Sequence, residues 1–258
     1  MELTKDTYEY LTNFADDRTV LNMLSANKKF NDEQFFKRVM ERKYPFLIPL
    51  KEDGETMRGL FVRMTYYIAK LEEDFGIPYI AFQRYNPERF YKKYKDDPNI
   101  YSRALEQAAK IDDLNIVRLM LDKGAVELNK ALVFSVLSEN TDMINLLIEK
   151  GANDFNLALA AASLKFNINL IEFFLSKGGS IGNGVWVAIN ENNLDLLNFF
   201  IVKGYTDYNS GLYHASELDN IHIVQFMIDK GATDFRLPRL IAYEKGHMDI
   251  VQLLDQYI

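Results

Sequence analysis

The chain has 258 residues, and its 30 basic and 37 acidic side chains give a net charge of −7. This acidic balance argues against a protein that binds nucleic acid or an anionic membrane, because both partners require a basic surface. There is no cysteine, which excludes disulfides, thiolate metal sites and cysteine nucleophiles. The start has no signal-peptide pattern and the apolar runs are too short to span a bilayer, so we expect an intracellular protein.

Residues 1–48 have apolar residues at helical spacing, divided by the short polar breaks "ADDRT" and "NKKFND", which predicts a small cluster of helices. The wording from residue 10 to residue 47, which includes "LSANKKF", resembles a degenerate F-box without its usual Leu-Pro opening. The resemblance implies docking on a Skp1-type protein through Leu11, Phe14, Val20, Leu21 and Leu24. The alternative is a helical domain that caps the repeats described below.

Residues 49–98 form a predicted connector, with a helix expected over 55–75 and an aromatic-rich segment over 76–97. Pro78, Pro87 and Pro98 are expected to limit regular structure there. We expect the aromatic side chains to cover the first repeat, and a binding groove is the alternative; these residues are Tyr79, Phe82, Tyr85, Phe90 and Tyr91. The run "RFYKKYK" is basic, but in an acidic chain it predicts a solvated face with buried rings rather than a nucleic-acid site.

A repeat with a period of about 27 residues occupies residues 99–258. Five of the glycines that follow lysine stand at positions 124, 151, 178, 204 and 231, so that successive ones are 27, 27, 26 and 27 residues apart. Upstream of them, small residues recur four positions apart, as in Ala158 and Ala162 or Gly184 and Ala188. A fixed period of this size is typical of stacked repeats. The predicted units are 99–126, 127–153, 154–180, 181–206, 207–233 and 234–258.

Each unit is predicted to hold two helices. The first carries its small residues at i and i+4, on one face, where a neighbouring helix can approach closely. The second reads like "NIVRLMLDKG": Asp or Asn opens it, Lys closes it, and Gly follows as a left-handed C-cap. The fold class predicted for the chain is therefore all-α, a solenoid of about six short repeats preceded by a small helical domain.

The wordings "DLNIVRLMLDKGA", "NNLDLLNFFIVKG" and "GHMDIVQLL" resemble the second helix of ankyrin repeats. The units here are shorter than the usual ~33 residues and lack the T-P-L-H opening, so the loops between them should be tight. In this they resemble the compact ankyrin repeats of large DNA viruses of protists. That resemblance implies a viral protein of the host cytoplasm.

The ankyrin resemblance implies a partner-binding concave face at the ends of the first helices. The residues it assigns there are Lys110, Ile111, Leu137, Ser138, Leu164, Lys165, Asn190, Glu191, Glu217, Leu218, Glu244 and Lys245. The four apolar members would be hot spots if exposed, or they would be buried between units by the short loops. Trp186 and Tyr213 occupy one column of the first helices. Core packing is the expectation for them, and an aromatic patch is the alternative.

The sequence offers no catalytic, metal-binding or cofactor-binding residues. The three histidines have no metal-ligand spacing, and "GGSIGNG" lacks the ending of a phosphate loop. We therefore expect a non-enzymatic, monomeric protein-interaction module, which with its F-box-like segment would be an adaptor that presents its partner to a ubiquitin ligase. The alternative is a self-assembling structural or virion-associated protein without dedicated cargo.

Overall fold

The structure, a computed structural model, describes residues 33–43, 45–78 and 86–258. Every regular element within these residues is a helix, which confirms the all-α prediction. By their contacts the residues form two compact units, which are described separately: unit 1 (Met1–Phe134 and Asn145–Lys150) and unit 2 (Ser135–Ile144 and Gly151–Ile258). Most of the F-box-like segment, with its five assigned contact residues, lies outside the described residues, as do Tyr79, Phe82 and Tyr85.

The described part of unit 1 contains a small helical core. Its elements are α3 (Glu33–Lys43), the 3-10 helix η1 (Pro45–Leu50), α4 (Met57–Phe75), α5 (Pro87–Tyr94), α6 (Ile100–Lys110) and α7 (Leu114–Asp122). The expected helix over 55–75 is confirmed as α4, which Thr56 caps at its start and Gly76 ends in a left-handed conformation. The rings of Phe36 and Phe61 are fully buried and lie 5.7 Å apart.

The expectation that prolines limit regular structure after residue 76 was wrong for α5. Pro87 is the first residue of this helix, where its missing N–H costs nothing, and the Asn86 side chain accepts a hydrogen bond from Arg89 N. Phe90 is fully buried, whereas Tyr91 packs on the α4 side chains Tyr67 and Phe75. In the "RFYKKYK" run the three lysines are exposed, as predicted, but of the three rings only Phe90 is buried, and Tyr91 and Tyr94 are half-buried.

Helices α8 (Asn129–Leu137) and α9 (Thr141–Glu149) form the next pair, and the boundary between the two units runs through both of them.

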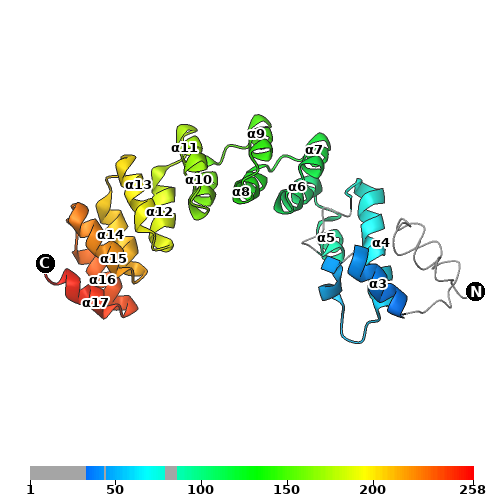
Figure 1. Cartoon of the computed structure of the whole chain (residues 1–258), viewed down its shortest axis with the longest axis horizontal. Helices are drawn as coiled ribbons and strands as arrows, with labels where there is room; N and C mark the ends of the chain where they lie inside the picture. Colours follow the sequence, from blue (N-terminus) through cyan, green and yellow to red (C-terminus); the bar gives the residue numbers. More distant parts are fainter. Residues whose placement is uncertain (1–32, 44, 79–85) are drawn as a thin grey trace, which may run out of the picture. The chain divides into compact units, whose positions relative to one another are not determined.

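Unit 2 consists mainly of four further helix pairs, each an N-terminal "first" helix followed by a "second" helix. The pairs are α10 (Phe155–Leu164) with α11 (Ile168–Ser176), α12 (Ile181–Asn190) with α13 (Leu194–Val202), α14 (Tyr208–Glu217) with α15 (Ile221–Lys230), and α16 (Arg236–Lys245) with α17 (Met248–Leu254). First helices contact one another in succession, α10 with α12, α12 with α14 and α14 with α16, so the pairs lie side by side in chain order (Figure 1).

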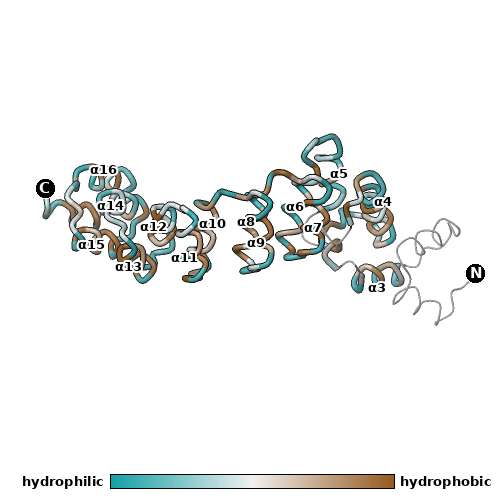
Figure 2. The backbone as a smooth tube through the Cα atoms, turned by 90° about the horizontal axis from the view of Figure 1, so that it is seen from above, coloured by the Kyte–Doolittle hydropathy of each residue, from teal (hydrophilic) through white to brown (hydrophobic). Residues whose placement is uncertain are grey.

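The ends of the second helices follow the predicted pattern. Asn167 and Asn193 are N-caps whose side chains accept from Leu170 N and Leu196 N. The glycines of the 27-residue column have φ between +94° and +110°, a region that glycine enters without the penalty that a Cβ brings. The apolar faces of the second helices are buried, and Figure 2 shows the brown of hydrophobic residues along much of α13.

Each first helix ends in a left-handed residue that the sequence analysis did not identify. These residues are Asp112, Glu139, Phe166, Asn192 and Asp219, with φ from +50° to +62°, and Gly246 in the last pair. Their backbone N–H groups, or those of the residues that follow, donate hydrogen bonds to carbonyls of the helix that has just ended, as Asn193 N does to Ala188 O at 2.8 Å. Every pair in the described chain therefore turns alike between its two helices.

Side chains also join neighbouring pairs of unit 2. Asn220 Nδ2 donates to Ile189 O at 2.7 Å, and the ring of His247 lies 3.2 Å from Glu217 O. At the other end of the first helices, Asn156 Oδ1 accepts from Ser180 N at 2.7 Å. These bonds, which connect residues 24 to 31 positions apart, fix the spacing of the pairs in addition to apolar packing.

Candidate functional site

The first helices of unit 2 have one buried face and one exposed face. Ala158 and Ala162 on α10 are fully buried, whereas Leu157 and Leu164 on the same helix are 50% and 54% exposed. Positions three and seven residues apart share a side of a helix, so equivalent residues of the successive first helices form one surface. We call it the first-helix face; its members are Leu157, Ala160, Leu164, Asn183, Trp186, Asn190, Ser210, Tyr213, Glu217, Leu237, Leu240 and Glu244.

This surface is apolar at its centre. Trp186 and Leu240 are each 50% exposed and belong to one column of residues, in which Tyr213 lies between them and is half-buried. Large apolar side chains that gather on a single exposed face are typical of interaction sites rather than of ordinary surface. The expected core packing of Trp186 was therefore wrong. Its position faces away from the small residues that pack against the second helices, so stacking leaves the indole uncovered.

None of the side chains assigned to the concave face by the ankyrin resemblance is buried. Those that are exposed are Ser138, Leu164, Lys165, Asn190, Glu191, Leu218, Glu244 and Lys245. Those that are half-buried are Lys110, Ile111, Leu137 and Glu217. The short loops do not cover Leu164 or Leu218, so the alternative of burial between units does not hold for these two. Ile111 and Leu137 are partly covered.

Charged side chains flank the apolar centre. In unit 2, Lys165 lies 3.7 Å from Glu139, and Lys245 lies 3.6 Å from Glu217. Both pairs are substantially exposed and contribute little to stability. Glu191 and Glu244 add further exposed carboxylates at the same edge. The surface therefore combines an apolar centre with a mostly acidic border, an arrangement that suits a protein partner.

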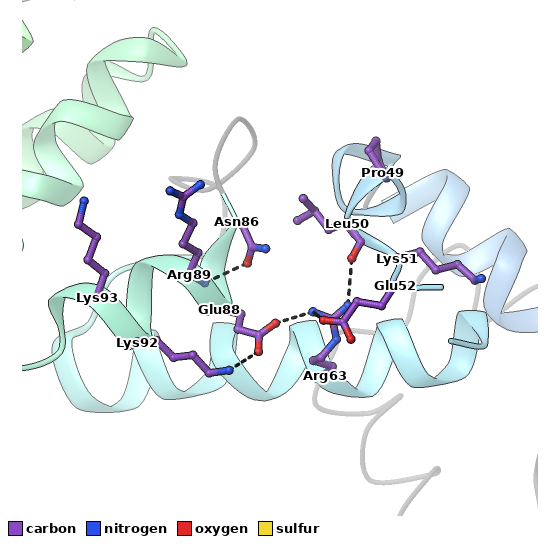
Figure 3. Close-up of a pocket in the computed structure, with 10 residues that line it drawn as sticks. All are labelled: Pro49, Leu50, Lys51, Glu52, Arg63, Asn86, Glu88, Arg89, Lys92 and Lys93. Atoms are coloured by element: carbon purple, nitrogen blue, oxygen red, sulfur yellow. Dashed lines mark hydrogen bonds and ion pairs between the residues drawn. The ribbon is translucent and has the colours of Figure 1, made fainter. Parts of the chain in front are cut away.

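Unit 1 has a separate pocket of about 530 Å³ beside α4 and α5, lined by Pro49, Leu50, Lys51, Glu52, Arg63, Asn86, Glu88, Arg89, Lys92 and Lys93 (Figure 3). Arg63, on α4, is one of these lining residues. Its guanidinium donates to Glu55 Oε1 at 2.9 Å, to Glu55 Oε2 at 2.7 Å and to Leu50 O at 3.0 Å, and it also pairs with Glu88.

These contacts account for the ionisation of the three groups. The hydrogen bond with Arg63 lowers the pKa of the Glu55 carboxyl. At Glu88, burial raises the pKa of the carboxyl, but hydrogen bonds from Lys92 and Arg63 lower it by more, so this pKa also lies below its usual value. The pKa of Arg63 is raised, chiefly by its bond to Glu55. The N–H groups of Arg63 already donate hydrogen bonds that join η1, α4 and α5. We therefore interpret this cluster as stabilising the fold of unit 1 rather than as a ligand site.

The part of the chain that the structure describes has no group of His, Asp and Glu that could hold a metal ion. Its described helices include none long and apolar enough to cross a membrane. Burial, and then the charge of Asp207, raise the pKa of Tyr205 to about 12. Its hydroxyl donates to Asp207 O at 2.6 Å, so it acts as a neutral structural donor.

Two features of this region were missed by the sequence analysis. One is a column of polar residues near the start of the first helices, Asn156 and Asn209 among them, that bind the loop of the next pair. The sequence shows this column as an asparagine two positions before the first small residue of a unit, as in Asn156 before Ala158 and Asn209 before Gly211. The other is the interruption of that column at Gly182, where the residue two positions before the small residue Gly184 is itself a glycine.

Comparison with protein-family models gives no match, and a search of curated proteins finds no significant relative.

Proposed function

We propose that this protein is a protein–protein interaction module of the ankyrin-repeat type, which holds a partner protein on its first-helix face. The proposal is supported by the helix pairs, by the glycine column that ends the second helices, and by the second-helix wording "DLNIVRLMLDKGA". The observation that carries it is the exposure of Leu157, Leu164, Trp186 and Leu240 on one side of successive first helices. Burial of exposed apolar surface of this kind against a partner stabilises the complex.

A narrower form of the proposal concerns the N-terminal segment. The "LSANKKF" wording and its resemblance to an F-box support an adaptor that docks on a Skp1-type protein and presents the captured partner to a ubiquitin ligase. The two halves are separable. If co-purification from a eukaryotic lysate recovers a partner but no Skp1-type protein, the ligase role fails and the binding role stands.

The binding role is tested by affinity purification with the full chain and two matched variants. Leu164→Glu with Leu240→Glu places charges on the first-helix face, at side chains that are 54% and 50% exposed. Val202→Glu places a charge on α13, at a side chain that is 77% exposed and belongs to a second helix. We expect the captured partner to be lost with the first variant and retained with Val202→Glu. Retention of the same partner by both variants would exclude the first-helix face.

The self-assembling alternative predicts a different result. The full chain would sediment as a larger species as its concentration rises, and the Leu164→Glu and Leu240→Glu changes would abolish that increase.

A further inference from the structure

The column of side-chain acceptors that binds each next pair is interrupted at Gly182. On α14, Asn209 Oδ1 accepts from Thr233 N at 2.7 Å and from Asp234 N at 3.0 Å. Asn156 on α10 makes the equivalent bond to Ser180 N. Gly182 occupies the same position on α12 and has no side chain to offer the equivalent N–H groups of Thr206 and Asp207. A Cβ added at Gly182 would meet only Ser180 Oγ, at 3.7 Å.

A pocket occupies the space that this glycine leaves between α12 and α14. It has a volume of about 210 Å³, and its lining includes Gly182, Trp186, Tyr205, Asp207, Ser210 and His214. Pockets for drug-sized ligands are typically larger, ~300–1,000 Å³, so this one suits a single side chain of a partner. It opens within the first-helix face, next to the half-exposed indole of Trp186.

The chemistry of the lining favours a positively charged guest. Its charged members are the Asp207 carboxylate and, when protonated, His214; the lining contains neither lysine nor arginine. Asp207 is exposed, and its two oxygens accept one bond each from Ser210, at 3.1 Å from N and 2.6 Å from Oγ, so both keep acceptor capacity. His214 faces Glu217, whose carboxylate lies 3.9 Å from its ring. The start of α14 offsets part of the Asp207 charge, and an indole face supplies a second attraction for a cation.

We propose that this pocket receives an arginine or lysine side chain from a peptide segment of the partner. The cationic head lies between the Asp207 carboxylate and the Trp186 indole, and neighbouring apolar side chains of the peptide cover Leu164 and Leu240. The inference rests on the proposed binding role of the first-helix face and names the chemistry of the partner. It also accounts for the glycine: an asparagine at position 182, as in the neighbouring repeats, would fill the pocket.

The test uses a display library of random 12-residue peptides selected on the immobilised full chain. Selected peptides are then titrated against three variants and followed by the emission of Trp186, the one tryptophan in the chain. Asp207→Asn removes the charge but keeps an oxygen that can cap Ser210 N. Gly182→Asn fills the pocket and restores the missing acceptor. Leu240→Ala alters the same face away from the pocket. Thermal melting of each variant verifies that it is folded.

We expect the selected peptides to be rich in arginine or lysine beside apolar residues, to shift the Trp186 emission saturably, and to bind Asp207→Asn and Gly182→Asn about tenfold more weakly. If Gly182→Asn does not fold, Asp207→Asn alone decides the question. Peptides without basic enrichment, or peptides that bind both variants within twofold of the original chain, would overturn the inference. If such peptides still depended on Leu240, the binding face would stand and only the pocket would fail. If no peptide depended on any of the three positions, the proposed function would fail too.

A second copy of this chain is the competing occupant, because residues 89–95 read "RFYKKYK". A synthetic peptide of this segment is therefore included as a probe. Binding that requires Asp207, together with concentration-dependent sedimentation of the chain, would identify self-association and contradict the separate partner proposed here.

Discussion

Gly184 on α12 lies directly against the ring of Phe200 on α13, so that a Cβ built on this glycine would fall 2.6 Å from both Cε atoms of the ring. Phe200 is fully buried, as is its counterpart Phe174 in the preceding pair. The small-residue column thus has a specific cause in unit 2: it allows a large side chain of the second helix to lie against the backbone of the first.

Gly184→Ala should therefore destabilise the protein by about 1–3 kcal/mol, since the added Cβ would displace the ring of Phe200, which is fully buried. Gly182→Ala, in the same helix, is the control; its Cβ has room, and alanine favours a helix over glycine by up to ~1 kcal/mol. Urea unfolding followed by circular dichroism measures both. Equal effects of the two substitutions would show that the Gly184 contact is misplaced.

Gly211→Ala should cost less than Gly184→Ala. The atoms that its Cβ would meet are Cε, at 2.5 Å, and Sδ, at 2.9 Å, of Met227, a flexible side chain that can change rotamer. We expect a loss of about 0.5–1.5 kcal/mol in the same unfolding experiment. A larger loss than at Gly184 would mean that the rigidity of the neighbouring side chain does not decide these costs.

Ala162→Leu should destabilise the protein by ~1–3 kcal/mol or more, because Ala162 is fully buried at a close helix contact. Ala160→Leu is the matched control on the same helix, at a half-buried position of the first-helix face. We expect this control to change the melting temperature little. An unchanged melting temperature for Ala162→Leu would contradict the placement of the small-residue column.

Arg63→Met should destabilise unit 1 by roughly 1–3 kcal/mol at pH 7, because Glu55, only 15% exposed at its side chain, would lose the cation to which it is bonded. Glu88, which is 14% exposed, would keep only its pair with Lys92. Lys37→Met, which removes one exposed pair with Glu41, is the control and should cost under ~0.5 kcal/mol.

This effect of Arg63 should depend on pH with a definite sign. The folded-state pKa values of Glu55 and Glu88 are lowered, so their stabilisation is complete above the unfolded pKa, about 4.3, and is lost as pH falls through the folded values. The free energies of unfolding of the original chain and of Arg63→Met should therefore differ at pH 7, and the difference should shrink steadily as the pH falls below the unfolded pKa of about 4.3. A difference that stays constant over this range would contradict the ion-pair account.

The sequence allowed the helix pairs and the ends of the second helices to be predicted because local rules decide them. An asparagine at an N-cap and a glycine at a left-handed C-cap each depend on only a few neighbouring residues. Because the same residues recur in every repeat, the prediction of the helix ends rests on several copies of one pattern. Helix α5 was missed because Pro87 can either break a helix or begin one, and the Asn86 cap that decides between these depends on the surrounding backbone.

The candidate site could be predicted only in part. The exposed positions at the ends of first helices followed from the ankyrin resemblance, but the exposure of Trp186 did not, since a lone tryptophan is usually well covered. The pocket exists because Gly182 on α12 has no side chain to fill the space beside Asp207, which precedes α14. A relationship between residues 25 positions apart becomes visible only when the pairs are stacked.

Binding of a partner to the first-helix face can be located by hydrogen–deuterium exchange of the full chain with and without the protein that it captures. We expect binding to slow exchange in α10, α12, α14 and α16 and in the loops before them, and to leave α11, α13 and α15 unchanged. Slowed exchange confined to the second helices, with the first helices unaffected, would contradict it.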